Sequence, residues 1–169
     1  MENVQLEHDS HNAAKKKYPL CILAHDMESP ENIGSIFRIA DSLGLEKIFL
    51  SGSSPIPPNP KIKKTSRSTE KHVPFEYFKN PTKVLTRLKD LDYKIISLEI
   101  TSSSLDIRNL KITPDEKICL IVGSENYGVD QSLLDVSDEC VHITMMGMNS
   151  SMNVAVACGI ACWEILRGR

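Results

Sequence analysis

The sequence predicts an α/β domain built on a mostly parallel β-sheet. Short, continuous apolar runs alternate along the chain with stretches in which apolar residues recur at helical spacing. This alternation is typical of strand–helix–strand units, whose strands lie parallel. The runs are apolar throughout rather than at every second position, which favours strands buried on both faces. A chain of 169 residues fits one domain of this kind.

The first strand–helix–strand unit has clear boundaries. Residues 19–25 form the first apolar run. Ser29 then supplies a helix N-cap and Pro30 suits the first helical position. Apolar residues at helical spacing continue to Leu43, where a glycine ends the helix, and residues 46–50 form the second strand.

The later elements are weaker but continue the pattern. Residues 51–72 are expected to be irregular, because they hold several prolines and then the basic stretch KIKKTSRSTEKH. Residues 73–78 are expected to be an edge strand, since Pro74 cannot donate to a ladder. The remaining predictions are a helix over 81–91, a strand over 93–98, a polar connection over 99–116, a buried strand over 117–122, a short helix from about 130 and a strand over 140–145.

The last segment, from Met152 to Leu166, is apolar nearly all the way round. A helix without a polar face is normally buried, so this one should pack on earlier elements, on a partner subunit or on both. The loop before it is rich in Gly, Asn and Ser, and its backbone could approach a ligand closely.

Composition excludes several classes of protein. No run of 18 apolar residues and no signal-peptide core occur, so we expect no membrane association and a cytoplasmic location. The five cysteines form no C-x-x-C pair and are expected to be reduced core residues. H-E-x-x-H and EF-hand patterns are also absent, so no metal site is predicted. His25 is interpreted as structural or incidental.

The formal net charge of −2 gives no global signature of nucleic-acid binding, but a basic patch can be local. Residues 1–18 are expected to be a flexible arm with three lysines at 15–17, followed by the domain over 19–169. The arm could be a solvated tail or a contact for RNA. The basic stretch within 61–72 has the same two interpretations.

The predicted ligand site lies where strands end. Loops follow the strands over 19–25, 117–122 and 140–145, and ligands of parallel sheets bind at such carboxyl ends. The chain lacks a phosphate-binding P-loop and a G-x-G-x-x-G fingerprint. On spacing alone, Asn32 could be a helix cap and Arg38 a solvated side chain.

Three segments carry a family resemblance: N-I-G-S-I-F-R at 32–38, G-S-E-N-Y-G at 123–128 and S-M-N-V-A-V-A at 151–157. In order and spacing they resemble the motifs of the SpoU (TrmH-like) branch of the SPOUT RNA 2′-O-methyltransferases. The resemblance implies a sheet with helices on both faces and a C-terminal trefoil knot. It also implies a homodimer formed through the knot region, which would explain the apolar last helix.

The resemblance further implies S-adenosylmethionine as the cofactor and RNA as the substrate. Backbone groups and apolar side chains suit adenine, which has a flat apolar face and a polar edge. The residues that the resemblance assigns to cofactor binding are Leu98, Gly123, Gly128, Ile143, Met145 and Met152.

The resemblance assigns the reaction to Arg38, with Asn32, Asn153, Ser151 and Glu125 around it. Arginine keeps its proton, so we expect Arg38 to stabilise the developing alkoxide and grip a phosphate rather than act as a base. The two asparagines would fix the motif loops and the ribose, Ser151 would hydrogen-bond within the site, and Glu125 would accept hydrogen bonds or pair with a basic group. The residues expected to bind RNA are Arg38, Lys63, Lys64, Arg67, Arg167 and Arg169.

The leading hypothesis is therefore methyl transfer from S-adenosylmethionine to a ribose 2′-hydroxyl of tRNA or rRNA. Two alternatives stand beside it. One is a catalytically idle RNA-binding protein with the same fold. The other is an α/β enzyme that uses a different adenosine cofactor.

Overall fold

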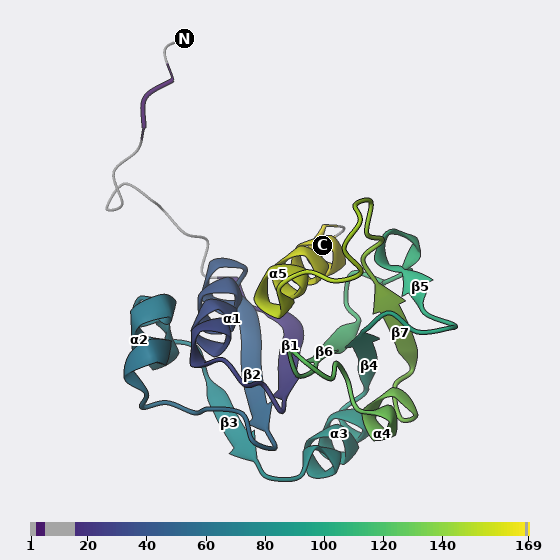
Figure 1. Cartoon of the computed structure of the whole chain (residues 1–169), viewed down its shortest axis with the longest axis horizontal. Helices are drawn as coiled ribbons and strands as arrows, with labels where there is room; N and C mark the ends of the chain where they lie inside the picture. Colours follow the sequence, from purple (N-terminus) through teal and green to yellow (C-terminus); the bar gives the residue numbers. More distant parts are fainter. Residues whose placement is uncertain (1–2, 6–15, 168) are drawn as a thin grey trace.

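A seven-stranded sheet in which every neighbouring pair is parallel forms the centre of the protein (Figure 1). Its order is β3-β2-β1-β6-β4-β7-β5. The computed structural model describes residues 3–5, 16–167 and 169. The strands are β1 (Tyr18–His25), β2 (Leu45–Ser51), β3 (Phe75–Phe78), β4 (Tyr93–Leu98), β5 (Leu105–Asp106), β6 (Lys117–Val122) and β7 (Glu139–His142). The helices are α1 (Pro30–Ser42), α2 (Pro60–Ser66), α3 (Pro81–Asp90), α4 (Gln131–Leu134) and α5 (Val154–Leu166), with 3-10 turns η2 (Thr69–Lys71) and η3 (Ile107–Asn109).

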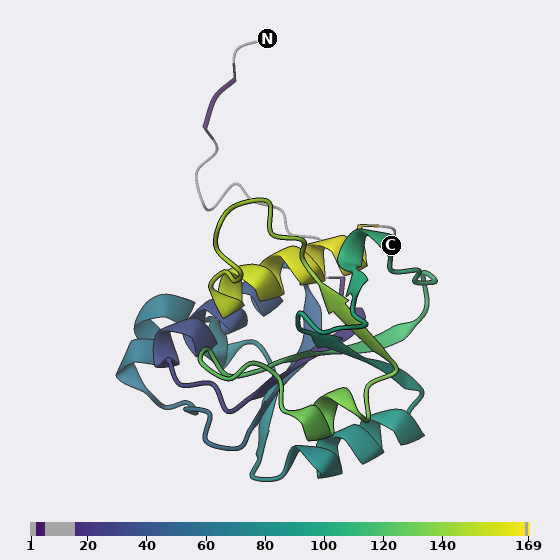
Figure 2. The ribbon, with the colours of Figure 1, turned by 45° about the vertical axis from the view of Figure 1, so that its right-hand side comes forward.

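Helices cover both faces of the sheet, as the resemblance implies. Figure 2 shows α1 and α5 on one side and α3 and α4 on the other. Side chains alternate between the two layers: Leu20 and Ile22 of β1 join the α1/α5 core, whereas Cys21 and Leu23 join the α3/α4 core. Burial on both faces explains why these strands are apolar throughout.

Several predicted boundaries are confirmed. Ser29 caps α1, and its hydroxyl accepts a hydrogen bond from the Asn32 N–H at 3.2 Å. Asn80 caps α3 in the same way. β3 lies at an edge of the sheet, as Pro74 predicted.

The trefoil knot stays a prediction. Most of the predicted N-terminal arm lies outside the described residues. No helix of the described chain is long and apolar enough to cross a bilayer.

The prediction that residues 51–72 are irregular is wrong, because they contain α2 and η2. Asn59 caps α2 by accepting hydrogen bonds from the N–H groups of Lys61 and Ile62. Ile62 is fully buried against α1. The run of prolines and lysines hid a helix that is held by one cap and one apolar anchor.

Two further expectations need correction. The polar connection over 99–116 contains β5 and η3, which buries Ile107 in the core. The strand expected over 140–145 ends at His142, and an irregular loop over 143–153 leads to α5. In that loop the backbone leaves the sheet although Ile143, Met145 and Met146 are apolar.

The middle strands bring their carboxyl ends to one edge of the sheet. β1 lies beside β6 with Ala24 opposite Val122, and β4 lies beside β7 with Leu98 opposite Val141. The segments that follow these strands therefore meet, although they are far apart in the sequence.

The contact between α1 and α2 depends on Gly34. A Cβ atom there would lie 1.9 Å from the Thr65 hydroxyl oxygen and 2.6 Å from the Ile62 carbonyl oxygen. We expect Gly34→Ala to lower the free energy of unfolding by about 1–3 kcal/mol, because the backbone of α2 must move. Urea denaturation measures this, with Gly147→Ala as the control, since a Cβ at Gly147 meets nothing within 4 Å. Equal stability of the two variants would contradict this packing.

Candidate functional site

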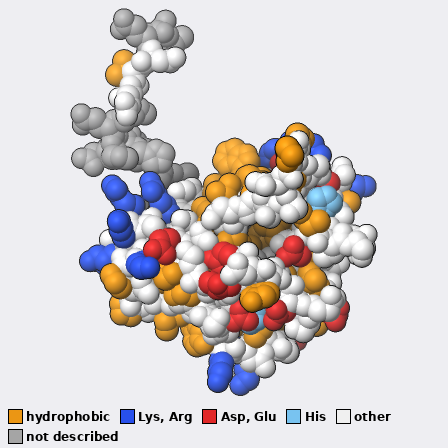
Figure 3. Space-filling view, in the orientation of Figure 1, with side chains coloured by type: hydrophobic (Ala, Val, Ile, Leu, Met, Phe, Trp, Pro, Cys, Tyr) orange, Lys and Arg blue, Asp and Glu red, His pale blue; other side chains and the backbone are white. Residues whose placement is uncertain are grey.

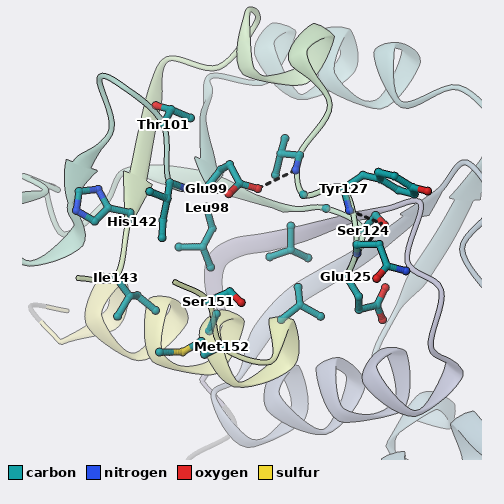
Figure 4. Close-up of a pocket in the computed structure, with 18 of the residues that line it drawn as sticks. Leu98, Glu99, Thr101, Ser124, Glu125, Tyr127, His142, Ile143, Ser151 and Met152 are labelled. Carbon is teal, nitrogen blue, oxygen red and sulfur yellow. Dashed lines mark hydrogen bonds between the residues drawn. The ribbon is translucent and has the colours of Figure 1, made fainter. Parts of the chain in front are cut away.

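A cavity of about 730 Å³ opens at the carboxyl ends of β4, β6 and β7 (Figure 4). Its walls are the end of β4, the loop over 123–129 that follows β6, and the loop over 143–153 that leads into α5. The volume is that of an ordinary small-molecule site. The cavity thus lies where the sequence places the ligand.

The residues that the resemblance assigns to cofactor binding are brought together. Leu98, Gly123, Gly128, Ile143, Met145 and Met152 all line the cavity. Ser151, Glu125 and Asn153 line it as well, whereas Asn32 and Arg38 do not.

Two glycines give the 123–128 loop its tight shape. A Cβ at Gly123 would lie 2.0 Å from the carbonyl oxygen of Gly128, and Gly128 has a φ of +70°. Ser124 and Gly128 close the loop by exchanging two backbone hydrogen bonds of 3.0 and 2.9 Å. Only residues without a side chain allow this close return of the backbone, so both glycines have a geometric role.

A network of hydrogen bonds joins the three motif segments. The Glu125 carboxylate accepts hydrogen bonds from the N–H groups of Glu28 at 2.7 Å and Ser29 at 3.0 Å, and from the Asn32 amide at 2.7 Å. The Asn153 amide donates to the Asn32 side-chain oxygen at 3.0 Å. Asn32 therefore lies between Glu125 and Asn153, and we call these three residues the motif clamp.

The motif clamp is reinforced at both ends. The Asn153 side-chain oxygen caps α5 by accepting from the N–H groups of Ala155 and Val156. The Glu28 carboxylate returns to the β6 loop and accepts from the side chains of Ser124 and Asn126. Glu125 is thus a hydrogen-bond acceptor, one of the two roles the sequence left open for it.

The environment of Glu125 favours its charged form. Partial burial of the carboxylate acts to raise its pKa, but the hydrogen bonds from Glu28, Asn32 and Ser29 outweigh this effect. The pKa of Glu125 is therefore below its ordinary value.

Arg38 lies apart from the cavity. Its exposed side chain lines a second, mostly apolar groove between α1 and α5, together with Ile39, Ile160 and Trp163. The predicted reaction residues therefore divide into two groups: the motif clamp and Ser151 at the cavity, and Arg38 at the groove.

The predicted RNA-binding residues lie in three places: Arg38 at the groove, a group on and after α2, and two arginines that follow α5. Lys63, Lys64 and Arg67 are exposed on α2 and at its end. Basic side chains gather over this side of the molecule, whereas acidic ones gather nearer the cavity (Figure 3). Arg167 pairs with Glu164 at 2.7 Å. Arg169 donates to the Glu116 carbonyl oxygen, and its Nε and Nη1 are buried without a partner among the described atoms.

His25 has a structural environment, in keeping with the interpretation from sequence. It is buried, and its Nδ1 lies 2.8 Å from the Ser51 hydroxyl oxygen. Its Nε2 faces carboxylate oxygens of Asp26 at 3.1 Å and Asp130 at 3.4 Å. These three residues could in principle offer atoms to a metal ion. The imidazole itself already bridges the two carboxylates, and it ties the segment after the β6 loop to the end of β1.

Several residues that line the cavity were not assigned to the site from sequence, among them Glu99, Thr101, Tyr127 and His142. Glu99 directly follows the strand that ends at Leu98. The only available signal for it was this position at the carboxyl end of a parallel strand.

Glu125→Gln tests the motif clamp. The folded-state pKa of Glu125 is depressed, so its contribution to stability is present above the unfolded pKa of about 4.3 and is lost as pH falls through the folded pKa. We expect the variant to lose about 1 kcal/mol at pH 7 and to show a weaker loss of stability on acidification. Urea denaturation at pH 7 and pH 4 measures both, with Glu139→Gln as control. A variant with an unchanged pH dependence would argue against the clamp.

The comparisons with known proteins agree with this geometry. The SpoU rRNA Methylase family model matches residues 19–163. A protein of Staphylococcus aureus (strain COL) described as a TrmH family tRNA/rRNA methyltransferase is 30% identical over 156 residues, which are 92% of this chain and 62% of the relative. The chain thus spans about three fifths of the length of the curated relatives it matches.

Two solved structures share the fold. The SpoU methyltransferase AviRb from Streptomyces viridochromogenes aligns with a TM-score of 0.81 and 25% identity, over 89% of this chain and 59% of AviRb. The TrmH/SpoU tRNA modifying enzyme of A. aeolicus gives a TM-score of 0.81 and 25% identity, over 90% of this chain and 76% of that enzyme. The family model, the relatives and the convergence of the three motifs agree: the chain belongs to the SpoU rRNA methylase family.

Proposed function

We propose that the protein is an RNA methyltransferase that uses S-adenosylmethionine and acts on a ribose 2′-hydroxyl of tRNA or rRNA. The observation that carries the proposal is the motif clamp, which joins three distant segments of the chain beside a cavity at the carboxyl ends of the strands. Family membership supports methyl transfer to RNA. The choice of the ribose oxygen rests on the match of all three motifs.

The residues that line the cavity fit the cofactor. Leu98, Ile143 and Met152 offer apolar surface for the adenine, and the closely packed 123–128 loop offers main-chain groups for its polar edge. The carboxylates of Glu99 and Glu125 also line the cavity and suit a ligand that carries positive charge and hydroxyl groups. S-adenosylmethionine supplies the methyl group when bound, and the protein orients the acceptor.

Arg38 is the residue we assign to the acceptor oxygen. A 2′-hydroxyl becomes a better nucleophile as it loses its proton, and a fixed guanidinium stabilises the negative charge that develops. Among the described residues, Arg38 has no hydrogen-bonding or ionic partner within the chain, so its donors are available to a ribose and a phosphate. Its exposure to solvent is consistent with a role that begins only when RNA is bound.

We propose a homodimer formed through α5. One face of α5 is buried in the core, as Ala161 and Cys162 are, but the opposite face is apolar and open. On that face Val156, Ile160 and Trp163 are 55%, 42% and 64% exposed. Such a stripe on a helix is suited to a partner helix.

The same dimer would complete the site. Ile160 and Trp163 line the groove that contains Arg38, so a second copy that covers this face comes to lie against Arg38. Because Arg38 does not line the cavity of its own chain, we propose that it acts on a ribose held at the partner's cavity. Lys63, Lys64 and Arg67 on the neighbouring α2 would then contact phosphates of the same RNA.

Arg38→Ala tests the proposed reaction. We expect transfer of a labelled methyl group to RNA to fall by about 10²–10³ in kcat, the usual effect of losing one stabilising donor. Binding of S-adenosylmethionine, measured by calorimetry, should be unchanged. Arg87→Ala is the control, since Arg87 is an exposed arginine of α3 that pairs with Glu76 away from the cavity. Methylation by the Arg38 variant at the parent's rate would contradict the assignment.

Ile160→Glu tests the proposed dimer. A buried charge would prevent the apolar faces from meeting, so light scattering after size exclusion should give the mass of one chain, and methyl transfer should fall with it. Ile56→Glu is a matched control, because Ile56 is 43% exposed on a loop away from α5. A dimer that persists in the Ile160 variant would place the interface elsewhere. Ala161 and Ala157 are less suitable positions, because Ala161 is fully buried and Ala157 lines the cavity, so a charge at either one disturbs more than the interface.

A further inference from the structure

The Glu99 carboxylate lies inside the cavity, directly after β4. One of its oxygens accepts a hydrogen bond from the Ile100 N–H at 2.9 Å, and the other accepts from the Val129 N–H at 2.9 Å (Figure 4). Glu99 therefore joins the end of β4 to the loop that follows β6.

The position of this carboxylate is fixed by its surroundings. Gly128 packs against it so closely that a Cβ there would lie 2.2 Å from the Glu99 Oε2 atom. The loop that carries Gly128 is itself closed by the paired backbone hydrogen bonds with Ser124. A side chain held by two N–H groups and a close backbone contact is oriented before any ligand arrives.

The carboxylate keeps acceptor capacity that the chain does not use. Two carboxylate oxygens offer about four acceptor positions, and the two N–H groups fill half of them. Among the described residues, no lysine, arginine or histidine pairs with Glu99. A ligand that fills the cavity displaces water from these positions, so it must supply donors or leave a charged group unsatisfied.

The place of Glu99 in the cavity indicates which donors these are. In Figure 4, Glu99 lies between the apolar side chains of Leu98 and Ile143 on one side and the loop with Ser124 and Glu125 on the other. The apolar end suits adenine and the polar end lies beside the motif clamp. Ribose is the middle part of S-adenosylmethionine, and its adjacent 2′- and 3′-hydroxyls are two donors that one carboxylate can accept together.

We infer that Glu99 is a cofactor-binding residue that accepts hydrogen bonds from the ribose hydroxyls of S-adenosylmethionine. The inference rests on the cofactor of the proposed function but not on the RNA atom that is methylated. Binding and methyl transfer can therefore fail separately.

Calorimetry of the full chain with four ligands tests the inference. The ligands are S-adenosylhomocysteine, 5′-methylthioadenosine, which lacks the amino-acid part, and the 2′-deoxy and 3′-deoxy forms of 5′-methylthioadenosine. We expect Glu99→Gln to weaken the first two ligands by about 10- to 100-fold, the usual effect of losing a charged hydrogen bond. Glu116→Gln is the control, because Glu116 also accepts a backbone N–H, from Thr113, but lies outside the cavity.

The deoxy ligands test the inference even if the Glu99→Gln variant folds poorly, because they are also measured with the unaltered protein. With the unaltered protein, removal of either hydroxyl should cost at least about tenfold in affinity. In a folded Glu99 variant the same removal should cost little, which is a coupling that a purely structural role would not give. Equal binding of ribose and deoxyribose ligands by the unaltered protein would overturn the inference. So would a variant that loses S-adenosylhomocysteine but keeps 5′-methylthioadenosine, since Glu99 would then bind the ammonium group. If the unaltered protein binds neither S-adenosylhomocysteine nor 5′-methylthioadenosine, the proposed cofactor site and this inference are both wrong.

Discussion

The site depends on one carboxylate that faces the amino end of a helix. Glu125 comes from the loop after β6, and it accepts hydrogen bonds from N–H groups that precede α1 and from Asn32 on the first turn of that helix. The first N–H groups of a helix lack partners within it, so an ionised carboxylate is a favourable neighbour. Through Asn32 and Asn153 the same interaction extends to the start of α5. Three distant segments of the chain thereby hold one geometry.

The parallel sheet makes this interaction possible. β1 and β6 are neighbours, and they end within one residue of each other in register, so the loops that follow them begin side by side. The cavity opens beside β6, where β4 and β7 also end. The groove with Arg38 opens instead on the outer side of α1 and α5. The fold thus separates a region that holds a small molecule from a surface that can meet a large one.

Much of this arrangement could be predicted from the sequence. Strands that are apolar on both faces, the Ser29 and Asn80 caps and the three motifs are local signals, and the structure confirms the elements they predict. α2 was missed because its prolines and lysines hid it, and the burial of Ile62 against α1, where Gly34 allows the two helices to approach, is a tertiary contact that no local pattern shows. The separation of Arg38 from the motif clamp was missed for a related reason. Asn32 and Arg38 share one helix, and only tertiary packing decides which of them faces the cavity.

The most direct test of the central claim is the chemical position of a transferred methyl group. The protein is incubated with labelled S-adenosylmethionine and total RNA from cells that lack it, and the RNA is hydrolysed in alkali. Methylation of a 2′-hydroxyl blocks cleavage of the adjacent phosphodiester, so the label should appear in alkali-stable dinucleotides. Label in mononucleotides would show that a base is methylated. Absence of label, with the protein folded and the cofactor bound, would contradict transfer to RNA altogether.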